Sequence, residues 1–171
     1  MHQQEKMLGH LADSRQQVVA RKNKGEISPE MEDLLAEALP KIDAEGKRFI
    51  REVVVFNRII GNTNCVKTTS ADDDAILYAR RPYNDGETRF VKNRDPEPSN
   101  KLYIVLKRSN DKFNYVLIKA AIGEAREPEM WDEVYFEIDS TARGRSNEFW
   151  SSHAIVWGSE EVLPESVVVI N

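Results

Sequence analysis

The tripeptide Asn84-Asp85-Gly86 places the strongest constraint on how this chain can fold. Asn-Gly and Asp-Gly sequences accept the positive φ angles of tight β-turns, so they join antiparallel strands. Runs rich in apolar and aromatic residues lie on both sides, at 75–81 and 88–93. The sequence therefore predicts a β-hairpin here, and with it a sheet in the second half of the chain.

Short strand-like runs separated by turn residues continue to the end of the chain. The runs 102–107 and 113–119 predict a second hairpin, because the polar turn residues Ser109-Asn110-Asp111 lie between them. We expect only strands and loops after Gly61. The other expected strands are 65–69, 134–138, 154–157 and 167–170, with loops at 124–130 and 140–146.

The first 61 residues show apolar residues at helical spacing. The stripe that predicts a first helix, ending at Gly25, consists of Met7, Leu8, Leu11, Val18 and Val19. Ser28-Pro29-Glu30 predicts the start of a second helix, which runs to Pro40. Serine is a good helix cap, proline suits the first helical position, and an acid in the first turn complements the helix dipole.

A third helix is predicted between Asp43 and Gly61. Its apolar face would consist of Phe49, Val53, Phe56 and Ile60. The β-branched run Val53–Val55 also fits a strand, so both interpretations stay open for this part.

Helices followed by hairpin-linked strands indicate an α+β fold class with a mainly antiparallel, hairpin-rich sheet. We predict an N-terminal helical region over residues 1–61 and an antiparallel β-rich domain over residues 62–171. A chain of 171 residues suits one compact domain overall.

The charge of the chain is unevenly distributed. The net charge is −5, but the segment 76–119 contains ten Lys and Arg residues and only five acidic ones. This basic centre predicts a sheet that faces an anion, although solvated strand edges rich in Lys and Arg would give the same composition. The apolar runs are too short to span a membrane, and no secretory signal is present, so we expect a cytoplasmic protein.

Several site classes lack support in the sequence. Cys65 is the only cysteine, which excludes an intrachain disulfide and a cysteine-based zinc site. No phosphate-binding glycine loop, zinc-protease motif or hydrolase elbow occurs. We interpret Asp72-Asp73-Asp74 as a solvated turn rather than a cation site, and we expect no metal and no cofactor.

The segment TRFVKNR (88–94) combines basic, aromatic and hydroxyl side chains. Because alternate strand residues share a face, Thr88 and Lys92 point one way and Arg89 the other. Such side chains suit a phosphodiester, since cations hold the phosphate and a ring stacks on a base. An exposed hairpin explains the same letters. Arg80, Arg81 and Tyr83, just before the hairpin turn, are the further candidate substrate-binding residues.

The stretch EFWSSHAIVWG contains His153, the only histidine of the predicted sheet region. Histidine acts as an acid or base near neutral pH, and Ser152 beside it could position a substrate. The alternative is a histidine that only bonds a loop carbonyl at the entrance of a strand. Our site hypothesis is that His153, Arg89 and Lys92 meet in one cleft as catalytic residues, with Thr88 and Ser152 as substrate contacts.

Two resemblances follow from these residues. TRFVKNR and FWSSHAIVWG (149–158) resemble segments of a group of uncharacterised bacterial proteins of similar length. The layout of elements resembles that of the metal-independent ribonuclease toxins grouped with barnase, EndoU, the tRNase colicins and RelE-like toxins. The second resemblance implies RNA cleavage through attack by the 2′-hydroxyl, with His153 as base or acid and an antitoxin or immunity protein as partner.

Two other functions remain open. The basic hairpin would also suit a non-catalytic module that binds RNA or a protein. The N-terminal stripe from Met7 to Val19 could form a homodimer, or it could pack back onto the sheet.

Overall fold

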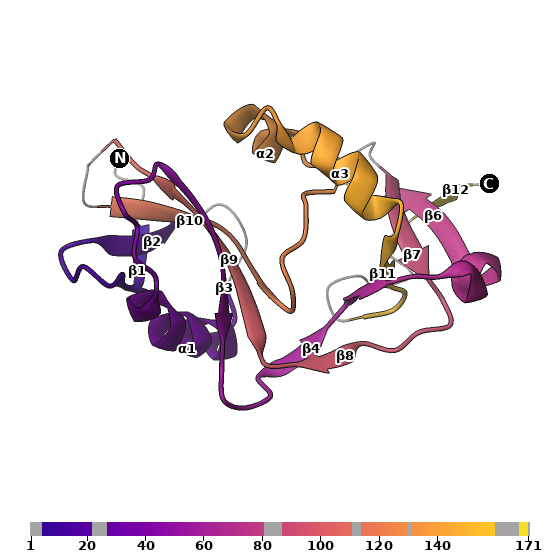
Figure 1. Ribbon diagram of the computed structural model, residues 1–171, viewed down its shortest axis with the longest axis horizontal. Helices are drawn as coiled ribbons and strands as arrows, with labels where there is room; N and C mark the ends of the chain where they lie inside the picture. The colour runs from indigo at the N-terminus through magenta and orange to yellow at the C-terminus, as the bar shows by residue number, and fades with distance from the viewer. Residues whose placement is uncertain are drawn as a thin grey trace. The chain divides into compact units, whose positions relative to one another are not determined.

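The computed structural model folds into two compact units (Figure 1). The first unit combines Met1–Gly61 with Ser99–Ala125, and the second combines Asn62–Pro98 with Arg126–Asn171. The described residues are 5–21, 27–80, 87–110, 114–129, 131–159 and 168–170.

The first unit contains a five-stranded sheet. Its strands, in spatial order, are β1 (Glu5–His10), β2 (Gln17–Arg21), β10 (Asn114–Ile122), β9 (Lys101–Arg108) and β3 (Phe49–Val55). Neighbouring strands are antiparallel except for β2 and β10, which run parallel. The predicted second hairpin is confirmed by the antiparallel pairing of β9 and β10.

Helix α1 (Pro29–Ala38) begins at the predicted position and continues into the short 3₁₀ helix η1 (Leu39–Lys41). The Ser28 hydroxyl accepts a hydrogen bond from the Met31 amide at 3.1 Å, which caps the helix. The helix and the sheet enclose one apolar core. Fully buried members of this core are Leu35, Ala38, Leu39, Leu102, Ile104, Leu106 and Tyr115.

The predicted N-terminal helices are wrong on either side of α1, because β1, β2 and β3 occupy those segments and the first helix begins only at residue 29. The α+β class with antiparallel-rich sheets holds, but helices do not precede the strands. In β3, Ile50 and Val54 lie opposite Leu106 and Leu102 of β9 and reach the core. Residues four apart share a face in a strand as well as in a helix, so this spacing did not separate the two structures.

The second unit contains another five-stranded sheet. Its strands, in spatial order, are β12 (Val168–Ile170), β6 (Ile76–Arg80), β7 (Glu87–Val91), β11 (His153–Val156) and β5 (Cys65–Lys67). Only β7 and β11 pair in parallel. The antiparallel pairing of β6 with β7 confirms the strands of the predicted first hairpin, while its turn, Asn84-Asp85-Gly86, lies outside the described residues. A separate two-stranded sheet joins β4 (Gly61–Thr63) to β8 (Glu97–Ser99).

The prediction of only strands and loops after Gly61 is wrong. Helices α2 (Glu133–Ile138) and α3 (Ala142–Trp150) and the 3₁₀ helix η2 (Ser70–Ala75) all follow it. The buried stripe of α3 is Ala142, Ser146 and Trp150, spaced four apart. Because two of these three residues are small and only the tryptophan is strongly apolar, the segment 140–146 shows little apolar periodicity and was predicted to be a loop. No helix in the described part of the chain is long and apolar enough to cross a membrane.

The core of the first unit leads to a test of the fold. Leu35→Ala should lower the free energy of unfolding by about 2–5 kcal/mol, because it opens a cavity beside a fully buried side chain. Leu34→Ala, on the neighbouring and only partly buried position, is the matched control and should cost clearly less. Urea denaturation measures both; equal losses would contradict the orientation of α1.

Candidate functional site

The pairing of β11 with β7 determines which side chains share a face of the second sheet. Ile155 lies opposite Phe90 in this parallel pair, so both project from the same face. They pack there with Trp150 from α3 in one buried cluster. His153 and Thr88, two positions earlier on their strands, belong to this same face, which we call the α3 face.

The imidazole of His153 is fixed by the end of α3. Its ring stacks on the Phe149 ring, with centroids 3.8 Å apart and planes 8° from parallel. Its Nδ1 lies 3.0 Å from the Phe149 carbonyl oxygen and 3.1 Å from the Ser152 hydroxyl. The Ser152 hydroxyl itself donates to the Phe149 carbonyl. Figure 1 shows α3 leading directly into β11. Phe149 is in the last turn of α3 and His153 is the first residue of β11.

These contacts select one tautomer of the neutral ring. A carbonyl oxygen only accepts hydrogen bonds, so the proton must reside on Nδ1. Nε2 then carries a lone pair, and no hydrogen bond to it occurs within the described part of the chain. The His153 ring is only half-buried and is therefore not enclosed by the core. A neutral imidazole with a free Nε2 lone pair is a candidate general base.

The surroundings of His153 favour its neutral form. Burial lowers the pKa of His153, and the positive charges of Lys67 and Arg89 lower it further. The hydrogen bond to the Phe149 carbonyl acts in the opposite direction, but the resulting pKa lies below the ordinary histidine value.

Lys67 is a cation on the α3 face, directly beside His153. The two residues are directly opposite each other in the antiparallel pair of β5 and β11. Side chains at such positions start about 5 Å apart on one face. Lys67 is exposed, so its ammonium group is accessible to an anion beside His153. Lys67 could not be recognised from the sequence, because no local pattern links a lysine at 67 to a histidine at 153.

Arg89 does not join this group. It lies on β7 between Thr88 and Phe90, and therefore on the face opposite His153. Its Nη1 donates to the Thr68 hydroxyl at 2.8 Å and to the backbone carbonyl of His153 at 3.0 Å. The predicted cleft of His153 with Arg89 is thus not assembled, since the guanidinium group binds the back of the strand that carries the histidine.

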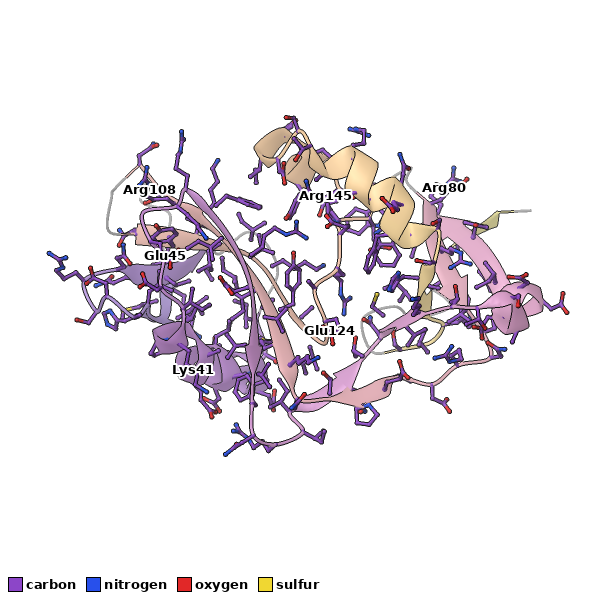
Figure 2. The ribbon with its side chains drawn as sticks, in the orientation of Figure 1. Lys41, Glu45, Arg80, Arg108, Glu124 and Arg145 are labelled. Atoms are coloured by element: carbon purple, nitrogen blue, oxygen red, sulfur yellow. The ribbon has the colours of Figure 1, made fainter. Side chains whose placement is uncertain are left out.

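The other predicted residues are scattered. Arg80, at the end of β6, is exposed (Figure 2), and so is Lys92, which follows β7. Thr88 is almost fully buried, at 1% exposure. Arg81 and Tyr83 lie outside the described residues.

A pocket of about 380 Å³ lies in the second unit. Residues from both faces of the sheet line it, since Tyr78 and Arg89 are opposite each other in β6 and β7, whereas Thr88 belongs to the α3 face. Trp150 and Ser151, which line it, come just before Ser152 and His153 in the sequence. Its lining residues are Tyr78, Glu87, Thr88, Arg89, Glu129, Asn147, Trp150 and Ser151.

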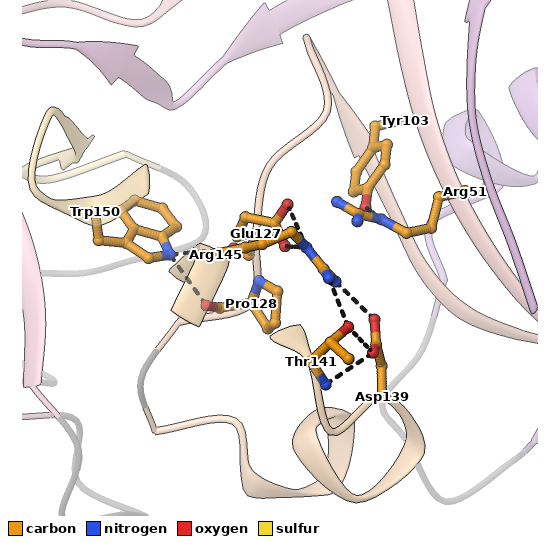
Figure 3. Close-up of polar contacts among 8 residues, drawn as sticks. All are labelled: Arg51, Tyr103, Glu127, Pro128, Asp139, Thr141, Arg145 and Trp150. Carbon is orange, nitrogen blue, oxygen red and sulfur yellow. Dashed lines mark hydrogen bonds and ion pairs between the residues drawn. The ribbon is translucent and has the colours of Figure 1, made fainter. Parts of the chain in front are cut away.

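A network on α3 holds the helix that positions His153 (Figure 3). Arg145 pairs with Asp139 at 2.7 Å and with Glu127 at 3.3 Å. The Trp150 indole nitrogen donates to the carbonyls of Glu127 and Pro128, both at 3.1 Å. Two side chains of one helix thus bind the segment that precedes α2, which restrains the last turn of α3.

Asp72 has a structural role rather than a ligand-binding one. Its carboxylate accepts from the Thr69 amide at 2.9 Å, in a capping box at the start of η2, and from Arg94 at 3.3 Å. Among the described residues, no group of three His, Cys, Asp or Glu side chains could hold a metal ion.

The chain matches no protein-family model, no curated protein and no solved structure.

The position of Arg89 predicts that its loss destabilises the second unit. Arg89→Ala should lower the free energy of unfolding by about 1.5–3 kcal/mol, because it removes charged hydrogen bonds to Thr68 and to β11. Lys92→Ala, an exposed neighbour, should change it by less than about 0.5 kcal/mol. Urea denaturation compares the two, and an equally mild Arg89→Ala would contradict the structural role.

The charge of Lys67 leads to a titration experiment. By NMR, His153 should titrate below the ordinary histidine pKa of about 6.5, and Lys67→Ala should raise this pKa because a nearby positive charge is removed. The folded pKa lies below the unfolded one, so the free energy of unfolding should fall as the pH drops through this interval. Lys47→Ala, in the first unit, is the control and should leave the His153 pKa unchanged. An unchanged His153 pKa in Lys67→Ala would contradict the electrostatic interaction between Lys67 and His153.

Proposed function

We propose that this protein is a metal-independent ribonuclease that cleaves RNA through attack by the 2′-hydroxyl, with His153 as the general base. The observation that carries the proposal is the fixed His153 tautomer, with Nδ1–H bound to the Phe149 carbonyl and the Nε2 lone pair free of hydrogen bonds to the described residues. RNA supplies its own nucleophile, so a base and a cation are sufficient and no cofactor is required.

The reaction can be written for these two residues. Nε2 of His153 takes the proton of the 2′-hydroxyl, and the 2′-oxygen forms a bond to phosphorus. The bond between phosphorus and the 5′-oxygen breaks, and the leaving oxygen takes a proton from water. Lys67, opposite His153 on β5, would stabilise the negative charge that develops on the phosphate. The products are a 2′,3′-cyclic phosphate end and a 5′-hydroxyl end.

In this proposal Lys67 takes the role that was predicted for Arg89 and Lys92. It shares a face with His153, whereas the Arg89 guanidinium binds Thr68 on the opposite face. The second candidate function is a module that binds RNA without cleaving it. The orientation of Arg89 favours this alternative over the enzyme, because the guanidinium group expected to stabilise the transition state holds the strand of His153 instead.

The proposal predicts a base-dependent cleavage in the presence of EDTA. Incubation with a single-stranded RNA should yield fragments with 2′,3′-cyclic phosphate ends, detected by mass spectrometry, and the matching DNA should stay intact. His153→Asn should reduce the rate by about 10²–10⁴-fold, because its amide can still donate to the Phe149 carbonyl but has no Nε2 base. Lys67→Ala should reduce it by about 10²-fold.

Matched variants separate the alternatives. Lys47→Ala, an exposed lysine of the first unit, should leave the rate unchanged. A rate lost in Lys92→Ala but kept in Lys67→Ala would reinstate the cation chosen from the sequence and refute the role of Lys67. RNA binding without any cleavage by the wild-type protein would refute the ribonuclease and support the binding module.

A further inference from the structure

The pocket in the second unit has the composition of a binding site for a planar, polar ligand. Its volume of about 380 Å³ falls within the range of small-molecule sites. Trp150 forms a rigid wall, because its indole nitrogen donates to two carbonyls and its ring packs edge-on against Phe149. Tyr78 adds a second aromatic side chain, which is 46% exposed. Aromatic side chains at a pocket of this size suit the stacking of a heteroaromatic ring.

The polar side chains of the pocket can read the edge of such a ring. Asn147 offers an amide donor and an acceptor, Ser151 offers a hydroxyl oxygen that can accept, and Glu87 offers a carboxylate. Asn147 and Glu87 are exposed and so accessible to a ligand. The lining also contains one cation, Arg89, but its guanidinium group is bound to Thr68 and to the His153 carbonyl. The two carboxylates of the lining, Glu87 and Glu129, accept hydrogen bonds from N–H groups and repel a phosphate, so the lining favours a nucleobase over the charged part of a nucleotide.

The place of the pocket in the chain connects it to His153. Trp150 and Ser151 precede His153 by three and two residues, and Thr88 shares its face of the sheet. Lys67, the cation for phosphate, is directly opposite His153 on β5. A nucleotide whose base enters the pocket would thus carry its sugar and phosphate toward the start of β11, where His153 lies opposite Lys67 of β5.

We propose that this pocket binds a single nucleobase of an RNA chain and thereby selects the position at which the chain is cut. The selection of a cleavage position rests on the proposed ribonuclease function, whereas the binding of the base does not. Phosphate and base are then held by different groups, with Lys67 for the first and the pocket for the second.

Uncharged nucleosides test the base site independently of cleavage. Adenosine, guanosine, cytidine and uridine contain no phosphodiester, so the wild-type protein cannot cleave them and Lys67 has no phosphate to attract. Each is titrated against the protein by NMR, following the Asn147 side-chain amide and the Trp150 indole N–H. At least one nucleoside should shift both signals and bind at least about tenfold more tightly than ribose alone.

Asn147→Ala should weaken that nucleoside about tenfold, because an edge contact is lost. Glu148→Ala is the matched control: it is the next residue on α3, exposed as Asn147 is, and outside the pocket lining. Equal effects of the two substitutions, or no nucleoside that shifts either signal, would overturn the proposal.

The outcomes distinguish this inference from the ribonuclease function. Nucleoside binding without RNA cleavage would support the pocket and refute the enzyme. RNA cleavage without nucleoside binding would support the enzyme and refute the pocket. If both hold, Asn147→Ala should also reduce the preference of the enzyme for one base at the cleaved position, while the His153 pKa stays unchanged.

Discussion

The parallel pairing of β7 with β11 determines the arrangement of the second unit. Two parallel strands cannot be joined by a tight turn, so a long connection must return the chain to the same end of the sheet. In this chain that connection contains α3, which packs Trp150 against Phe90 and Ile155. The pairing thus determines on which face of the sheet α3 packs and to which face each side chain of β11 points. It also places His153 on the same face as Phe90 and α3.

The sequence predicted the strands of the second unit better than its helices. Alternating or continuous apolar runs indicate a strand directly from the local sequence. This is how the hairpin strands β6 and β7 and the last strands β11 and β12 could be predicted. Helix α3 was missed because its buried stripe needs only Ala142, Ser146 and Trp150. In the first 61 residues, by contrast, helices were predicted where strands occur. Apolar residues four apart share one face of a strand as well as of a helix, and the segments predicted as helices form the strands β1, β2 and β3.

The candidate site required information that a single sequence does not contain. The alternation of side chains along β7 correctly predicted that Thr88 and Arg89 point to opposite faces. It could not predict how β7 pairs with a strand more than sixty residues later in the chain. One residue of register decides whether Arg89 faces His153 or binds the back of its strand. The pairing of Lys67 with His153 is likewise non-local. His153 itself was recognisable, because it is a lone histidine at the entrance of an apolar strand.

The pair of Lys67 and His153 couples substrate binding to base strength in the proposed reaction. In the free protein, burial and the nearby positive charges keep the pKa of His153 low, so the ring is neutral near pH 7 but a weak base. A phosphate bound to Lys67 would offset that charge, and it would favour the protonated ring by direct attraction. The basicity of His153 would then rise when RNA is present, as proton transfer requires. Arg89, on the opposite face, would be less affected by the phosphate and would keep holding the strand.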